Sequence, residues 1–170
     1  LGAQLVLLFL FLGTAAAKEP DTVRVQEIAN WVTPEPIAAG EPISNRAAWQ
    51  ALAKRPEFAD AIKKASALAK KPIPAQPDSL YLDYSRTGNR DHWQRVAFDR
   101  RGMIRTLAAA ECLENQGRYI APLEKLIAAL CAEKTWVYPA HDKGLKNFRG
   151  QDVEIDLGSA SLGWELATAN

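Results

Sequence analysis

Residues 93–131 read WQRVAFDRRGMIRTLAAAECLENQGRYIAPLEKLIAALC, and this stretch decides the fold. Its apolar residues recur every three or four positions, the spacing that places side chains on one side of a helix. They are Trp93, Val96, Ala97, Ile104, Leu107, Ala108 and Cys112, then Leu123, Leu126, Ile127, Leu130 and Cys131. Gly117 suits the end of the first helix, and Pro122 suits the first turn of the second. The spacing predicts two antiparallel helices joined by a short turn.

The pattern continues on either side of this hairpin. Helical spacing predicts helices over residues 46–54 and 56–71, the first of them capped by Asn45. A further helix is predicted from residue 157, after an N-cap at Asp156. The predicted fold class is therefore all-α, built from helical hairpins.

Weaker local signals predict exceptions to this helical pattern. Residues 79–85 alternate weakly between apolar and polar, which favours a short extended piece, and residues 153–155 favour another. Asp91 follows a turn at 87–90 and is a candidate N-cap for the long helix after it.

The last predicted helix has an apolar side for which the sequence offers no partner helix. Its members are Leu157, Ala160, Ser161, Trp164, Ala167 and Thr168. We expect this side to need a partner helix from sequence beyond Asn170, so the C-terminal remainder of the same chain is an expected partner.

The N-terminus is typical of a secretory signal peptide. An unbroken apolar run at 5–12 is followed by small residues at 13–17 and then by Lys18. The run is shorter than the roughly 20 residues of a permanent membrane span, although an uncleaved anchor is the alternative. We expect residues 1–17 to be removed and the protein to be exported, to the periplasm or the exterior. Residues 18–45 are rich in proline and predict an extended N-terminal segment with one short helix over 23–32.

Composition excludes some function classes. The net charge is +1, so no strong positive field favours nucleic acid as a partner. Cys112 and Cys131 are the only cysteines, and their predicted positions on antiparallel helices differ by roughly 10 Å along the axis. A disulfide needs closer Cα atoms, so we expect two buried free thiols. No spacing indicates a zinc site, and we expect no metal or cofactor.

The long loop at 134–150 is the first place to look for function, because loops of this length inside a domain are usually functional. It carries Trp136, Tyr138, His141 and Asp142. A tryptophan can stack on a sugar ring, histidine and tyrosine can move protons, and Asp142 could orient His141 or bind a hydroxyl. In the alternative interpretation, Trp136 and Pro139 pack against the hairpin while His141 and Asp142 tie the loop down.

Three other polar positions are weaker candidates. Arg100 and Arg101 lie in the middle of a predicted helix, where they are either solvated or paired charges or face an anionic ligand. His92 is best interpreted as a residue of the first helical turn.

Four stretches resemble the heparinase II/III-like family. They are RRGMIRTLA at 100–108, AECLENQGR at 110–118, EKTWVYPAHD at 133–142 and DLGSA at 156–160. The resemblance spans residues 46–170, and the WVYPAHD run is its most specific part. It implies the N-terminal part of an α/α toroid, in a polysaccharide lyase acting on uronic-acid glycans.

The resemblance also implies how the roles are divided. Lyase chemistry removes the proton at C5 and protonates the leaving oxygen at C4, while donors neutralise the neighbouring carboxylate. In the family, Asn-His and Tyr on later helices and a His from a β domain look like the carriers of this chemistry, which we expect beyond Asn170. Trp136, His141 and Asp142 match an early loop and are expected to contact an acidic polysaccharide. Tyr138 and His141 remain weaker candidates for an acid–base pair.

Two alternatives compete with the lyase. A toroidal glycoside hydrolase needs two carboxylates flanking the scissile bond, and Glu133 and Asp142 are the only loop pair available. A non-catalytic glycan-binding or structural helical module is the other, because a fold alone does not establish activity.

Overall fold

The computed structural model describes residues 22–31 and 40–169 and divides the chain into two compact units, Leu1–Ile37 and Ala38–Asn170. In the first unit, α1 (Thr22–Trp31) has every residue exposed and stands where a short helix was expected. The predicted signal peptide at 1–17 lies outside the described residues. No helix of the described parts is both long and apolar enough to span a membrane.

The second unit is a set of helices around one long central helix. Its elements are α2 (Arg46–Ala53), α3 (Pro56–Leu68), α4 (Asp78–Thr87), α5 (Asp91–Glu114), α6 (Ile120–Cys131) and α7 (Leu157–Ala169). Over residues 22–31 and 40–169 the structure contains no strand, so the predicted all-α class is confirmed.

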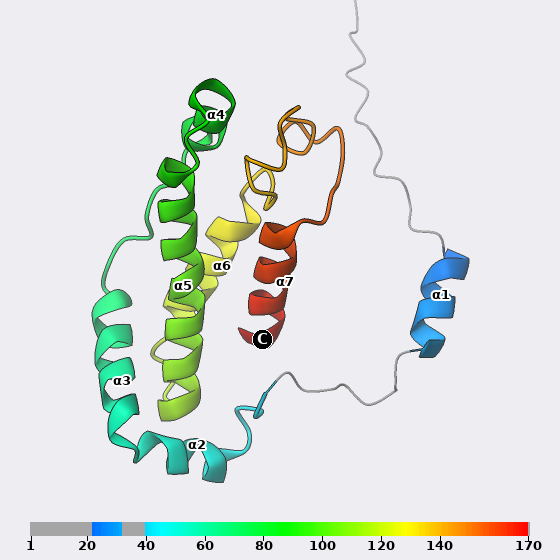
Figure 1. Cartoon of the computed structure of the whole chain (residues 1–170). Helices are drawn as coiled ribbons and strands as arrows, with labels where there is room; N and C mark the ends of the chain where they lie inside the picture. Colours follow the sequence, from blue (N-terminus) through cyan, green and yellow to red (C-terminus); the bar gives the residue numbers. More distant parts are fainter. Residues whose placement is uncertain (1–21, 32–39, 170) are drawn as a thin grey trace, which may run out of the picture. The chain divides into compact units, whose positions relative to one another are not determined.

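Helix α5 is the centre of this unit because each of the other five helices packs against it. Figure 1 shows α5 between α3 on one side and α7 on the other, with α6 crossing behind it. The main core cluster includes Ile104 and Leu107 of α5, Leu126 and Leu130 of α6, and Leu162 of α7, each at most 1% exposed. Burial of these apolar side chains is the main force that holds the helices together.

The predicted hairpin of α5 and α6 is confirmed, and one carboxylate organises its turn. Glu111 accepts hydrogen bonds from the backbone N–H groups of Gly117 (2.6 Å) and Tyr119 (3.0 Å). These N–H groups precede α6 and have no partner within that helix. The left-handed residue that ends α5 is Asn115, with φ of 53°, and Gly117 adopts a second positive φ of 73°.

Two predicted caps are confirmed and a third is wrong. Asn45 accepts from the N–H of Ala48, and Asp156 accepts from the N–H of Ser159 at 2.8 Å. The N-cap residue of α5 is Arg90 instead of Asp91, and the side-chain oxygen of Asn89, one residue earlier, accepts from the N–H of Asp91 at 2.8 Å. Asp91 is the first residue of the helix, where its charge is favourable to the helix dipole.

The extended piece predicted at 79–85 is also wrong, since these residues belong to α4. The weak alternation came from Leu80, Leu82 and Tyr84, but Leu80 and Tyr84 are also four positions apart, which is helical spacing. Tyr81 is buried at 4% exposure against Trp93, so tertiary packing supports the helix.

The cysteine prediction is half right. Both thiols are free, as expected. Cys131 is exposed and Cys112 is half-buried, so the predicted burial is wrong. Cys131 is the last residue of α6.

Helix α7 buries one side and exposes the other. Gly158, Leu162 and Glu165 are buried. The opposite side is the apolar one predicted from the sequence, and Leu157 and Trp164 on it are 74% and 63% exposed. Nothing in residues 40–169 covers that side.

Candidate functional site

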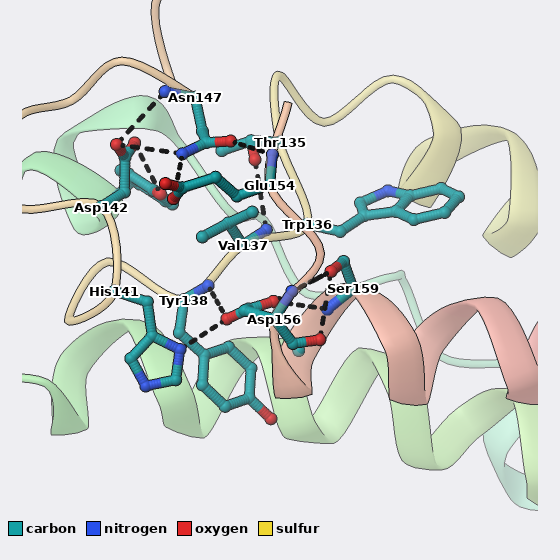
Figure 2. A network of polar contacts seen from close by, with 12 residues as sticks. Thr135, Trp136, Val137, Tyr138, His141, Asp142, Asn147, Glu154, Asp156 and Ser159 are labelled. Atoms are coloured by element: carbon teal, nitrogen blue, oxygen red, sulfur yellow. Dashed lines mark hydrogen bonds and ion pairs between the residues drawn. The ribbon is translucent and has the colours of Figure 1, made fainter. Parts of the chain in front are cut away.

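The segment between α6 and α7 is held in place by a buried carboxylate. Asp142 is 3% exposed and accepts hydrogen bonds from the Tyr81 hydroxyl (3.1 Å) and from the N–H groups of Asn147 (3.2 Å) and Phe148 (2.9 Å). Asn147 then binds Glu154 through both its side-chain oxygen and its amide nitrogen (Figure 2). A chain of hydrogen bonds thus connects α4 to the far end of the segment.

Tyr81 is the donor that completes this network from the helical core. Burial raises the pKa of its hydroxyl, and the Asp142 carboxylate raises it further. The hydroxyl therefore keeps its proton and remains a donor to Asp142.

Arg101 attaches the same segment to α5. Its guanidinium lies 5.7 Å from the Trp93 ring centroid and 5.4 Å from that of Tyr138. It donates to the carbonyls of Gly158 (3.2 Å) and Trp136 (3.3 Å), and it is 4% exposed. This arginine is therefore a structural cation, placed by aromatic rings and backbone carbonyls.

Arg100 is also paired inside the protein. It lies 3.3 Å from Glu133 and donates to the carbonyl of Pro74. Burial raises the pKa of Glu133, while Arg100 and Arg101 oppose that change. Of the alternatives for the two arginines, pairing is the one the structure shows, and neither is solvated.

Tyr138 lies directly on the first turn of α7. A Cβ atom at Gly158 would stand 2.4 Å from two carbons of the Tyr138 ring and 2.8 Å from the Trp136 carbonyl. Only glycine permits this approach, so Gly158 is a site residue that sequence reasoning missed. The helical position of a glycine two residues after a cap was the available signal.

The Asp156 carboxylate makes three separate structural contacts. It caps α7, accepts from the N–H of Tyr138 at 2.9 Å and lies 2.7 Å from Nδ1 of His141. Burial alone would raise its pKa, but the hydrogen bonds from Ser159, Tyr138 and His141 outweigh burial and hold the pKa below its ordinary value. Asp156 is therefore an anion at neutral pH.

His141 is the exposed member of the predicted site. Its side chain is 42% exposed, and Nδ1 is occupied by Asp156, which leaves Nε2 as the nitrogen available to a ligand. Its ring lies 5.6 Å from that of Tyr138, which in turn lies 6.0 Å from Phe98. The expected orientation of His141 by Asp142 is wrong, because Asp142 is saturated elsewhere and Asp156 takes that part.

Trp136 is half-buried and is held from inside the protein. Its indole N–H donates to the carbonyl of Leu130 at 2.9 Å, and its ring packs against the main core cluster. Pro139 is buried as well. Figure 2 shows Trp136 pointing away from Tyr138 and His141. These contacts are those of the packing alternative, in which the loop is tied to the hairpin.

The pair of carboxylates considered for a hydrolase is not free in the structure. Asp142 accepts four hydrogen bonds from within the chain, and Glu133 is paired with Arg100 with only 11% of its side chain exposed. Neither carboxylate is presented to a glycan. Within the described ranges, no group of His, Cys, Asp and Glu side chains is arranged to hold a metal ion.

The second histidine repeats the geometry of the first at a different place. His92 is 2.8 Å from Asp83 through Nδ1, and 54% of its side chain is exposed. It lies in the first turn of α5, as predicted, and has no aromatic neighbour among the ring contacts of the described residues. It is a natural control for His141.

The chain matches no protein-family model, and no curated protein matches it. The four stretches that resemble the heparinase II/III-like family and the geometry around His141 are thus the two supports for a function.

Proposed function

We propose that this chain belongs to an exported polysaccharide lyase-like protein that cleaves uronic-acid glycans by β-elimination, with residues 46–170 forming part of an α/α toroid. Its all-helical class and the α5–α6 hairpin agree with that architecture. In this proposal the helical unit binds the acidic glycan, and the reacting acid and base are not among its residues.

The observation that supports a binding role is the fixed, exposed imidazole of His141. Because Asp156 occupies Nδ1, the ring is oriented before a ligand arrives, and Nε2 of this 42%-exposed side chain is the nitrogen left for a ligand. A glycan hydroxyl can bind at Nε2, and a uronate carboxylate can accept from Nε2 when that nitrogen carries a proton. The rings of Tyr138 and Phe98 provide an adjoining apolar surface for a sugar ring.

Such a contact also serves the elimination reaction. The C5 proton of a uronate becomes acidic only when the charge developing on its carboxylate is stabilised by donors. In this proposal His141, on the protein surface that faces the glycan, contributes to that stabilisation or holds the neighbouring uronate in position.

A binding titration tests this role. We expect a hexuronate hexasaccharide to bind the whole chain, and a neutral hexasaccharide of the same length to bind much more weakly. His141→Gln should weaken hexuronate binding roughly tenfold, the value of one charge-assisted hydrogen bond. His92→Gln is the matched control and should change nothing. Equal loss in both variants, or none in His141→Gln, would refute the proposal.

A non-catalytic structural or glycan-binding module is the second candidate. It is favoured by the internal contacts of Trp136 and Asp142, which occupy both side chains within the chain. Incubation of the full-length protein with acidic glycans distinguishes the two, because only a lyase produces the absorbance of unsaturated uronate ends. Hexuronate binding without that absorbance would favour the second candidate.

A further inference from the structure

The stretch at 152–156, which leads into α7, turns alternate side chains inward. Glu154 accepts from the side-chain amide of Asn147 at 3.0 Å, and Asp156 accepts from the N–H of Tyr138 at 2.9 Å. Figure 2 shows both carboxylates pointing toward these inner partners, and Figure 1 shows the stretch as an open trace. Alternate residues whose side chains share one direction are typical of an extended strand.

The residues between these carboxylates turn apolar side chains outward. Val153, Ile155 and Leu157 are 91%, 86% and 74% exposed. A strand that met only water on this face would carry polar residues there, because exposed strand faces are polar in soluble proteins. Large apolar side chains at three successive outward positions therefore indicate a surface that contacts another molecule.

The main chain of the stretch also has a free edge. In a strand the N–H and C=O of one residue point to the same edge, and those of the next residue point to the opposite edge. The N–H of Glu154 donates to the Asn147 side-chain oxygen at 2.8 Å, so its edge faces the protein. On the other edge, the N–H and C=O of Ile155 and the C=O of Val153 have no partner within residues 40–169. Unpaired groups along one edge are a template for a further strand.

A cavity beside the stretch offers room for a side chain of such a strand. It has a volume of about 350 Å³, and its lining includes Trp136, Val137 and Val153. When a peptide adds to the edge of a strand, main-chain hydrogen bonds supply affinity and pockets for alternate side chains supply selectivity. The stretch at 152–156 has both of these elements.

Charge decides which strand this edge accepts. Side chains directly opposite each other on paired strands interact, and like charges at such positions are destabilising. Pairing with a second copy of the chain sets Glu154 opposite an acidic residue in each antiparallel register centred on residue 153, 154 or 155. A strand with lysine or arginine at these positions places opposite charges there instead.

We propose that residues 152–156 bind an extended segment of a partner protein in which apolar and basic residues alternate. The apolar residues of the partner contact Val153 and Ile155 and exchange main-chain hydrogen bonds with Ile155. Its basic residues lie opposite Glu154 and Asp156. The proposal does not depend on the proposed glycan function, because it uses the free edge of the main chain and not the imidazole of His141.

Titration of the whole chain with three acetylated heptapeptides tests the site. The peptide Lys-Val-Lys-Val-Lys-Val-Lys should bind roughly tenfold more tightly than its Glu-Val counterpart, which brings like charges to the edge. A third peptide, the Lys-Val sequence N-methylated at its valines, keeps every charge and side chain but lacks the N–H donors. It should bind roughly tenfold more weakly than the unmethylated peptide. Hydrogen exchange at the Ile155 amide should slow only with the unmethylated Lys-Val peptide.

Two variants separate the main chain from the side chains. Ile155→Pro removes the N–H at the free edge and should weaken binding of the Lys-Val peptide roughly tenfold. The double variant Val153→Ser/Ile155→Ser keeps the main chain and removes the apolar face, so it should weaken binding roughly threefold or more. Ile120→Ser, at a residue 43% exposed at the start of α6, is the matched control and should bind as the parent does. Far-ultraviolet circular dichroism checks that each variant is folded.

Three results would each overturn the proposal. They are absence of binding by the Lys-Val peptide, equal binding by its N-methylated form, and parent-like binding by both Ile155→Pro and the serine double variant. A parent chain that sediments as a dimer, together with a monomeric Ile155→Pro, would assign the edge to a second copy and overturn the choice of partner. His141→Gln should bind the Lys-Val peptide normally, so its loss of hexuronate binding reports on the proposed function alone.

Discussion

At the residue scale, single side chains with several partners fix the segment between α6 and α7. Asp142, Asp156 and Arg101 each bind atoms from distant parts of the chain. Their neighbours in sequence gave no sign of these partners. Asp156 was predicted as a cap, which is correct, but its contact with His141 joins residues 15 positions apart and required the folded chain.

Gly158→Ala should destabilise the fold. The new methyl group would have to displace the Tyr138 ring and the Trp136 carbonyl, and overpacking of this kind costs about 1–3 kcal/mol. Gly163→Ala, in the same helix but with nothing beyond its own helical backbone within 4 Å of its Cβ position, should stabilise by about 0.5–1 kcal/mol. Urea unfolding of both variants measures the difference. Equal effects at the two glycines would show that the close approach at Gly158 carries no energetic weight.

Asp156 should make the fold sensitive to acid. Its pKa in the folded chain is below the ordinary value of 3.8, so its stabilisation is present above that value and is lost as pH falls through the folded pKa. The parent should therefore lose more stability between neutral pH and about pH 3 than Asp156→Asn does. Urea unfolding at the two pH values measures this, with Asp60→Asn on an exposed part of α3 as the control. A parent and Asp156→Asn with parallel losses would contradict the assignment.

At the element scale, helices with a strong apolar period were predictable from the sequence. Helices that depend on tertiary contacts were not. The α5–α6 hairpin followed from apolar spacing alone, because its two helices bury one side each against a neighbour close in sequence. Helix α4 was missed because its ten residues carry a weak pattern, and its stability comes from Tyr81 packing against Trp93 and Phe148. For the site, the loop residues were found, but the role of each depended on long-range hydrogen bonds that no local pattern records.

The network of Asp142 should hold its loop and α4 together. Asp142→Ala leaves the buried Tyr81 hydroxyl and the N–H of Phe148 without an acceptor, a loss of about 2–4 kcal/mol in unfolding free energy. Tyr81→Phe removes only one donor and should cost about 1 kcal/mol. Hydrogen exchange at the amides of Asn147 and Phe148 should rise strongly in Asp142→Ala and little in Tyr81→Phe. Unchanged exchange in Asp142→Ala would show that the turns of the loop hold themselves.

At the scale of the whole molecule, the helices around α5 bury one of two helical tryptophans and leave the other exposed. Trp93 is 1% exposed between Tyr81 and Tyr138, whereas Trp164 on α7 is 63% exposed. The sequence identified both as members of helical apolar sides. Which side is covered depends on neighbouring helices, and for α7 those described cover only the side opposite Trp164.

The two tryptophans should differ sharply in stability. Trp93→Ala should lower the free energy of unfolding by about 3–5 kcal/mol because it empties a packed site and removes a ring from Arg101. Trp164→Ala should change it by less than about 1 kcal/mol. Thermal unfolding followed by circular dichroism compares them. A large loss at Trp164 would mean that α7 has a covering neighbour in solution.

The guanidinium of Arg101 has a consequence for how this protein can vary. Its two rings come from Trp93 and Tyr138, and its carbonyl partners come from residues on either side of the segment that leads into α7. Lysine could not replace it, because a single ammonium lacks the planar fork that donates to both carbonyls while lying beside the two rings. Tyr138 in turn requires the bare backbone of Gly158. We therefore expect positions 93, 101, 138 and 158 to covary, so that a change at one of them is tolerated only with compensating changes at the others.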